Sequence, residues 1–310
     1  MKKIAFLFPG QGSQSPGMGS GLLAHPIAEQ LFSQANDRLG FDLKALCLEG
    51  PADQLTLTQY AQPAILTVST IAHRIFAESF DGLPLFSAGH SLGEYSALVA
   101  AGVLDFADAL DIVYHRGLYM QEAVPVGVGS MAAVLGKDGA AIEALCKEQC
   151  GEQVVGPANY NCKGQIVISG HTDAVKRVLE HAKGKLLDVS APFHSQLMEP
   201  AAIQLNKKLE SVAFGQAKFA VVNNVANDLL SEGASFRSSL VAQVTAPVRW
   251  DTGVQKMIDL GAEGFVEFGQ GKVLAGMNKR IDRSIPCLHF GDLDELEGLK
   301  EQLSDFVSHQ

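Results

Sequence analysis

Short apolar runs alternate with longer helical patterns along the whole chain, which is typical of an α/β fold. The run Ile4–Phe8 is entirely apolar and is followed by Pro9 and Gly10, so it predicts a first buried strand. Residues 85–88 predict a second strand, which leads directly into a run of glycine, histidine and serine. Further strands are predicted at 219–223, 265–268 and 287–290, and we expect these segments to form a parallel sheet.

Two helices are predicted after the second strand. The first covers 92–101 and is closed by Gly102, and the second begins after Asp105, a favourable capping residue, and ends before Pro125. Apolar or small residues recur on one face of this second helix, namely Phe106, Leu110, Val113, Gly117 and Met120.

The order of elements changes in the middle of the chain. Strands are predicted at 130–135, 154–160, 165–169 and 185–189, helices at 139–150 and 172–183, and a turn at 161–164. This β-α-β-β-α-β order is that of a ferredoxin-like unit. We therefore expect a small domain at 127–190, inserted into a large discontinuous α/β domain formed by 1–126 and 191–310.

Composition and charge narrow the function class. Of the 310 residues, 47% are hydrophobic and 19% are charged, the balance of a protein with a sizeable core. The net charge of −10 argues against nucleic acid or an anionic membrane as a partner. The first apolar run is too short for a signal peptide, and no later segment could span a bilayer, so we expect a cytoplasmic protein. The five scattered cysteines are interpreted as reduced thiols without a metal, namely Cys47, Cys146, Cys150, Cys162 and Cys287.

The clearest chemical motif is the run from Gly89 to Gly93, which matches G-x-S-x-G with Ser91 at its centre. Its glycines allow a sharp strand-to-helix turn that exposes the serine hydroxyl, and the helix N-terminus supplies backbone N–H donors for an oxyanion. A purely structural turn is the alternative. Because the motif follows a predicted strand and opens a predicted helix, we interpret Ser91 as an activated nucleophile.

A nucleophilic serine needs a base, and the chain has nine histidines. His194 lies in the run 190–195, where the predicted insert returns to the large domain, and a domain junction favours a cleft. His289 is its rival near the C-terminus. Spacing alone leaves both open.

The loop at 9–14 follows the first strand and is rich in glycine and glutamine. It fails as a dinucleotide fingerprint, because Ser15 occupies the position of the third glycine and no acidic residue ends a second strand nearby. A tight loop whose backbone N–H groups point into a site is the better interpretation.

Taken together, these motifs resemble the malonyl-CoA:acyl carrier protein transacylases and, more distantly, polyketide acyltransferase domains. The matching runs cover the chain in order: PGQGSQ at 9–14, GHSLGEYSALVAAG at 89–102, YHRG at 114–117, ANYN at 158–161, APFHS at 191–195 and QVTAPVRW at 243–250. The resemblance implies a hydrolase-like α/β domain with a ferredoxin-like insert.

The resemblance also implies roles for individual residues. Ser91 is the nucleophile and His194 the general base and acid, while Arg116 holds the malonyl carboxylate. The backbone N–H groups of Gln11 and Leu92 form the oxyanion hole, and the backbone carbonyl of Gln243 orients the histidine. The acyl pocket or the coenzyme A site is lined by His90, Asn161, Gly164 and Phe193, with Lys163 standing where the family has proline. From the residues alone, Arg116 is an ordinary surface arginine late in an amphipathic helix.

The implied reaction is ping-pong transfer of a malonyl group from malonyl-CoA to the phosphopantetheine thiol of acyl carrier protein, which supplies fatty acid synthesis. Coenzyme A thioester is the substrate, and neither a cofactor nor a metal is expected; the protein is expected to be a monomer. An α/β-hydrolase-type esterase or thioesterase is the alternative, with His289 and either Asp259 or Glu267 completing its triad. A non-catalytic module that binds carrier protein is a third possibility.

Overall fold

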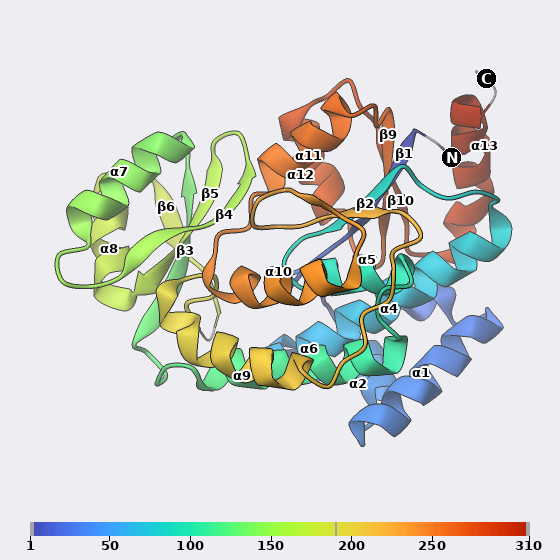
Figure 1. Ribbon diagram of the computed structural model, residues 1–310, viewed down its shortest axis with the longest axis horizontal. Helices are drawn as coiled ribbons and strands as arrows, with labels where there is room; N and C mark the ends of the chain where they lie inside the picture. The colour runs from blue at the N-terminus through green and yellow to red at the C-terminus, as the bar shows by residue number, and fades with distance from the viewer. Residues whose placement is uncertain (1–2, 190, 308–310) are drawn as a thin grey trace.

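A computed structural model describes residues 3–189 and 191–307, with side chains up to residue 304; Ser190, at the predicted domain boundary, and Lys2 lie outside the described residues. Figure 1 shows two sheets side by side, each with its own helices. The larger sheet has the strand order β10-β9-β1-β2-β7-β8. Its strands are β1 (Ile4–Phe8), β2 (Phe86–Gly89), β7 (Ala220–Val222), β8 (Leu229–Leu230), β9 (Gly264–Phe268) and β10 (Cys287–Phe290).

The larger sheet is parallel except at one edge. The register pairs β1 with both β2 and β9, β2 with β7 and β9 with β10, all parallel, whereas the two-residue strand β8 runs antiparallel to β7. The parallel sheet expected from the sequence is therefore confirmed, and one short antiparallel strand is added at its edge. Two residues after a turn carry no periodic signal that a sequence analysis could use.

Helices cover both faces of the larger sheet (Figure 1). They are α1 (Pro26–Leu39), α2 (Leu43–Glu49), α3 (Ala52–Thr56), α4 (Thr58–Ser79), α5 (Gly93–Ala100), α6 (Phe106–Glu122), α9 (Glu199–Leu209), α10 (Gly233–Thr245), α11 (Trp250–Asp259), α12 (Val273–Ile281) and α13 (Leu296–Val307). Alternate residues of β1 face opposite sides: Phe6 packs against Phe76 of α4, whereas Leu7 packs in a second core with Trp250 of α11.

The smaller sheet has the ferredoxin-like order that the pattern predicts. Its strands, β3 (Gly129–Leu135), β4 (Val155–Cys162), β5 (Gln165–His171) and β6 (Gly184–Leu186), lie in the order β4-β5-β3-β6 and pair antiparallel. The helices α7 (Gly139–Gln149) and α8 (Thr172–His181) pack on it around a separate core that includes Ile142, Ile168 and Val178. An isolated bridge between Asn159 and Val248 connects β4 to the large part of the chain.

Capping explains where α6 begins. The Asp105 side chain accepts a hydrogen bond from the Ala107 N–H at 2.8 Å, and the five residues predicted to form the inner face are all buried. Pro125 lies three residues beyond the last helical residue, Glu122, as expected.

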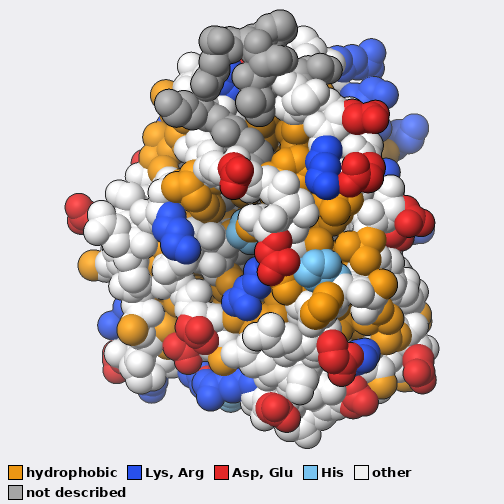
Figure 2. All heavy atoms as spheres, turned by 90° about the vertical axis from the view of Figure 1, so that its right-hand side faces the viewer, with side chains coloured by type: hydrophobic (Ala, Val, Ile, Leu, Met, Phe, Trp, Pro, Cys, Tyr) orange, Lys and Arg blue, Asp and Glu red, His pale blue; other side chains and the backbone are white. Residues whose placement is uncertain are grey.

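The described surface carries charges of both signs. Figure 2 looks onto the side of α1 and α13, where acidic and basic side chains are scattered among apolar ones. Within the described residues, no helix combines the length and apolar character needed to cross a bilayer, and no cluster of histidine, cysteine or carboxylate side chains is arranged to hold a metal.

Candidate active site

The turn between β2 and α5 presents Ser91. Its φ of 51° lies in the left-handed region, which costs a non-glycine residue about 1–3 kcal/mol. The turn is so tight that a Cβ on Gly89 would lie 1.9 Å from the backbone of Gly93, and one on Gly93 would lie 2.0 Å from the Phe8 carbonyl oxygen. Glycine is therefore required at both ends of the turn.

A side chain from a distant part of the chain holds this turn in place. The Asn224 Oδ1 accepts a hydrogen bond from the Ser91 N–H at 2.6 Å, and its Nδ2 donates to the Gly89 carbonyl at 2.7 Å. Asn224 follows β7, the neighbour of β2 in the sheet, and is 3% exposed.

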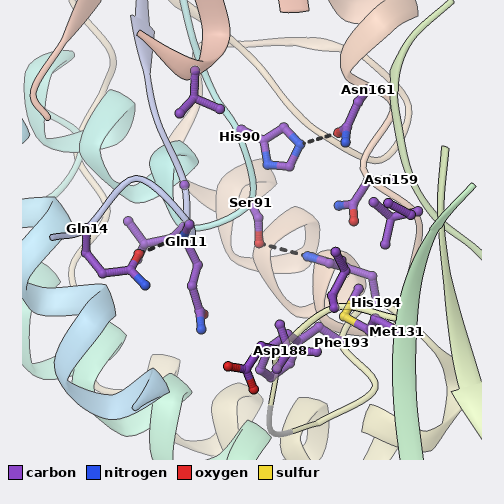
Figure 3. Close-up of a pocket in the computed structure, with 18 of the residues that line it drawn as sticks. Gln11, Gln14, His90, Ser91, Met131, Asn159, Asn161, Asp188, Phe193 and His194 are labelled. Atoms are coloured by element: carbon purple, nitrogen blue, oxygen red, sulfur yellow. Dashed lines mark hydrogen bonds between the residues drawn. The ribbon is translucent and has the colours of Figure 1, made fainter. Parts of the chain in front are cut away.

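The side chain of His194 lies next to that of Ser91. Its Nε2 lies 2.8 Å from the Ser91 Oγ, and its Nδ1 lies 2.8 Å from the Gln243 carbonyl oxygen. Figure 3 shows the serine and histidine side chains pointing toward each other across the pocket. Because a carbonyl can only accept, Nδ1 carries the proton and Nε2 is free to take the serine proton.

The environment keeps this histidine neutral. His194 is 5% exposed, and burial lowers its pKa to about 3, with the nearby Arg116 cation as the second cause. A neutral imidazole is the form that a general base needs.

Arg116 is buried beside the nucleophile. It projects from α6 and is 2% exposed; its Nη2 donates to the Ser91 Oγ at 3.2 Å and to the Gln243 Oε1 at 3.0 Å. Its Nη1 donates to the Gln62 Oε1 at 2.8 Å. The surface arginine expected from the residues alone is thus wrong, because Arg116 is a buried cation beside the Ser91 hydroxyl.

The loop at 9–14 packs directly against the serine turn. A Cβ on Gly10 would lie 2.3 Å from the His90 carbonyl oxygen, and the His90 N–H donates to the Phe8 carbonyl at 3.0 Å. Gln11 and Leu92, which belong to these two segments, both line the cavity in front of Ser91. The two proposed N–H donors therefore belong to backbone segments that the close packing holds together.

A cavity of about 370 Å³ lies between the two sheets and contains the reactive groups. Its lining includes Met131, Val167 and Leu187 from the small part, and Val273, Leu274 and Met277 from the large part. His90, Asn161 and Phe193 line it as well, and the His90 Nε2 lies 2.8 Å from the Asn161 Oδ1 (Figure 3). Gly164 does not line it; together with Lys163 it borders a separate groove on the other side of β4.

Comparisons with known proteins show the family of this chain. The family described as the acyl transferase domain matches residues 5–280. The chain belongs to the acyl transferase family. Among curated relatives, the malonyl CoA-acyl carrier protein transacylases of Escherichia coli K12 and Bacillus subtilis 168 are 47% and 45% identical; the alignments cover 91% and 96% of this chain and 93% and 96% of theirs.

Solved structures of acyl transferases superpose on the whole chain. The malonyl CoA-acyl carrier protein transacylase of Coxiella burnetii has a TM-score of 0.95 at 41% identity and covers 97% of this chain and 98% of its own. A malonyl-transacylase in complex with a type II polyketide acyl carrier protein has a TM-score of 0.94 at 42% identity, and covers 97% and 99%. The hydrolase-like domain with its ferredoxin-like insert is therefore the fold of this acyl transferase.

The rival hydrolase triad is not assembled in this acyl transferase. His289 bonds the Glu295 carboxylate and the Gly269 carbonyl, and Glu267 caps α12 by accepting from the Leu274 and Ala275 N–H groups. Asp259 lies at the exposed end of α11. These side chains all lie outside the lining of the cavity that holds Ser91.

Three polar residues of the site have no counterpart among the sequence predictions. Gln62 lies on α4, for which no helix was predicted, and Glu94 directly follows the serine motif but had no assigned role. Asn224 comes directly after a predicted strand; polar residues at the carboxyl ends of parallel strands are a signal that could have identified it.

Proposed function

We propose that this acyl transferase moves a malonyl group from malonyl-CoA to the phosphopantetheine thiol of acyl carrier protein, through an ester on Ser91. The observation that carries the proposal is the buried guanidinium of Arg116, 3.2 Å from the Ser91 hydroxyl. A cation at this place fits an acyl group that bears its own carboxylate. The relatives are named as transacylases of malonyl-CoA and acyl carrier protein, and these names support the same substrates.

In the first half-reaction, His194 takes the Ser91 proton while the hydroxyl oxygen attacks the thioester carbonyl. The backbone N–H groups of Gln11 and Leu92 stabilise the tetrahedral oxyanion. As the intermediate collapses, the C–S bond breaks, and the protonated His194 returns its proton to the departing coenzyme A thiol. The malonyl ester of Ser91 remains.

The second half-reaction repeats these steps with a different thiol. The phosphopantetheine thiol of the carrier protein gives its proton to His194 and attacks the ester, and Ser91 leaves with a proton from the histidine. The Gln243 carbonyl keeps the same tautomer in place throughout. No electron transfer occurs, so the reaction needs no redox cofactor.

Arg116 selects the acyl group. A guanidinium pairs with a carboxylate through two parallel hydrogen bonds. A neutral acyl group would leave this buried cation without such a partner, and burial already lowers the pKa of Arg116.

Other residues shape access to the serine. His90, Asn161 and Phe193 would contact the acyl group or the pantetheine arm, and Gly164 would act only on a more distant part of coenzyme A. We place the insert at 127–190, and expect a cytoplasmic monomer.

Covalent labelling tests the proposal. Malonyl-CoA without an acceptor should add one malonyl group to Ser91, which intact mass and peptide mapping would detect. Ser91→Ala should abolish the label and the transfer, whereas Cys162→Ala, on β4, should keep both. A label on a cysteine would contradict the proposal. Release of free malonate in place of transfer would favour the thioesterase, and a protein that never acylates would be a binding module.

A further inference from the structure

Glu94 is a buried carboxylate without a role in the reaction described above. It lies in the first turn of α5, is 0% exposed and is absent from the cavity lining. Burial raises its pKa to about 7. Removing a carboxylate from water costs free energy, so we expect a buried carboxylate this close to the site to have a function there.

One oxygen of this carboxylate makes both of its hydrogen bonds. Glu94 Oε2 accepts from the Gln243 Nε2 at 2.8 Å and from the Asn224 N–H at 3.0 Å. The other oxygen, Oε1, is buried without a hydrogen-bond partner among the described residues. Glu94 thus contacts two residues, and each of them contacts the reactive groups.

Gln243 has a side-chain amide with one accepting and one donating end, so its orientation matters. The donating Nε2 faces three acceptors: Glu94 Oε2 at 2.8 Å, the Ser91 carbonyl oxygen at 3.1 Å and the Asn224 Oδ1 at 3.5 Å. The accepting Oε1 therefore faces Arg116, which can only donate. Reversing the amide would place its donor against the guanidinium.

We propose that Glu94 is a positioning residue that fixes the orientation of the Gln243 amide, and through it the place of Arg116 beside Ser91. This proposal rests on the proposed function, since it assumes that Arg116 receives the malonyl carboxylate. The Gln243 backbone carbonyl also bonds His194, so one residue links Glu94 to both the selecting cation and the base.

The second bond of Glu94 reaches the serine turn. Its acceptance of the Asn224 N–H fixes the residue whose side chain holds Ser91 and Gly89. An acceptor at Glu94 Oε2 therefore supports the strained turn as well.

Two nearly isosteric substitutions test the proposal. Glu94→Gln keeps a carbonyl oxygen that can accept from both donors, whereas Glu94→Met keeps the length of the side chain without an acceptor. We expect Glu94→Met to lower kcat/KM for malonyl-CoA by about 10–100-fold, the effect of a small misplacement of reacting groups, and to lower it less for acetyl-CoA. Glu94→Gln should remain within about threefold of the wild type.

Ser96→Ala is the matched control, because Ser96 is equally buried on α5 and its hydroxyl makes no hydrogen bond among the described residues. It should leave both substrates unchanged. Any one of three results would overturn the proposal: wild-type rates in Glu94→Met, equal losses of activity in Glu94→Met and Glu94→Gln, or equal losses for malonyl-CoA and acetyl-CoA. If wild-type Ser91 takes no malonyl label, the proposed function itself fails, whatever the Glu94 variants do.

A second substitution applies if Glu94→Met does not fold. Gln243→Glu turns the donor that faces Glu94 Oε2 into an acceptor, and it keeps the backbone carbonyl that bonds His194. Because the side chain of residue 243 is then repelled by Glu94, Arg116 should be displaced, and kcat/KM should fall by about 10–100-fold for malonyl-CoA and less for acetyl-CoA. Wild-type kcat/KM for malonyl-CoA in Gln243→Glu, or equal losses for the two thioesters, would overturn the proposal.

Discussion

Two residues of the site have strained backbone conformations. Ser91 and His194 have φ values of 51° and 57°, and each lies in the left-handed region that favours glycine. The two side chains meet at 2.8 Å, so the strain occurs where a hydroxyl must face an imidazole. The surrounding hydrogen bonds, above all those of Asn224, keep the serine turn in this conformation.

Arg116 gives the sharpest test of substrate choice. Arg116→Ala removes two charge-assisted hydrogen bonds to a carboxylate, each worth about 1.5–3 kcal/mol, so kcat/KM for malonyl-CoA should fall by about 10²–10⁴-fold. Acetyl-CoA should be used no worse than by the wild type, because no buried cation has to be left unpaired. Steady-state kinetics with both thioesters measures this.

Arg116→Lys is the control for charge alone. A lysine ammonium cannot reproduce the planar fork, so it should recover only part of the malonyl activity. If Arg116→Ala lowers the two substrates equally, the residue is structural, and malonyl selection must come from elsewhere in the cavity.

Sequence reasoning found the residues that lie in motifs and missed those that act across the chain. Ser91, His194 and Arg116 were expected, and the structure brings all three together. The roles of Glu94 and Asn224 were not. The place of Asn224 directly after a strand could have marked it as a site residue, but its contact with Glu94 spans 130 positions. A hydrogen-bond partner at such a distance has no signature in a single sequence.

At the scale of elements, periodicity was most informative where the chain is regular. The four strands and two helices of the small part were all expected, with ends that differ by at most three residues. The helices between β1 and β2 were not placed: α4 has fifteen buried residues in twenty-two, so it shows no polar face for periodicity to reveal. Burial on all sides erases the pattern that a surface helix displays.

The contact between β1 and α5 depends on a missing side chain. Gly93→Ala would place a methyl group 2.0 Å from the Phe8 carbonyl, which the two packed backbones can relieve only by moving apart. We expect a loss of at least about 2 kcal/mol in the free energy of unfolding, together with slower acylation of Ser91. Urea unfolding and the labelling rate measure the two effects.

Gly276→Ala supplies the comparison within another helix. A Cβ at this exposed position in α12 meets nothing within 4 Å, so alanine should raise the free energy of unfolding by up to about 1 kcal/mol. A Gly93→Ala variant as stable and active as the wild type would show that the turn tolerates a wider approach.

At the scale of the whole molecule, the cavity lies where two separately packed sheets meet. The small sheet has its own core around Ile168, and the large sheet has cores on both faces. The walls of the cavity therefore come from segments that no local pattern relates, such as those of Val167 in β5 and Leu274 in α12. A sequence can indicate that an insert exists, but which of its residues face the serine follows only from how the two parts pack.

The buried side chain of His73 should make the stability of the protein depend on pH. Its ring packs against Phe6, Phe8 and Phe268 at centroid distances of 5.6, 5.9 and 5.5 Å, and burial lowers its pKa from 6.5 to about 4. Between pH 6.5 and pH 4 the unfolded chain therefore binds a proton that the folded chain does not. The wild type should lose stability through this group as the pH falls through that window.

His73→Phe removes the proton-binding group, so the comparison cancels the other titrating residues. Between pH 7 and pH 5 the free energy of unfolding of the wild type should fall by about 2 kcal/mol more than that of the variant, since a shift of one pKa unit is worth about 1.4 kcal/mol. Urea unfolding of both chains at the two pH values gives this difference. If the difference in the free energy of unfolding between the wild type and His73→Phe stays constant with pH, His73 binds its proton as readily in the folded protein as in the unfolded chain. The aromatic cluster would then be open to water.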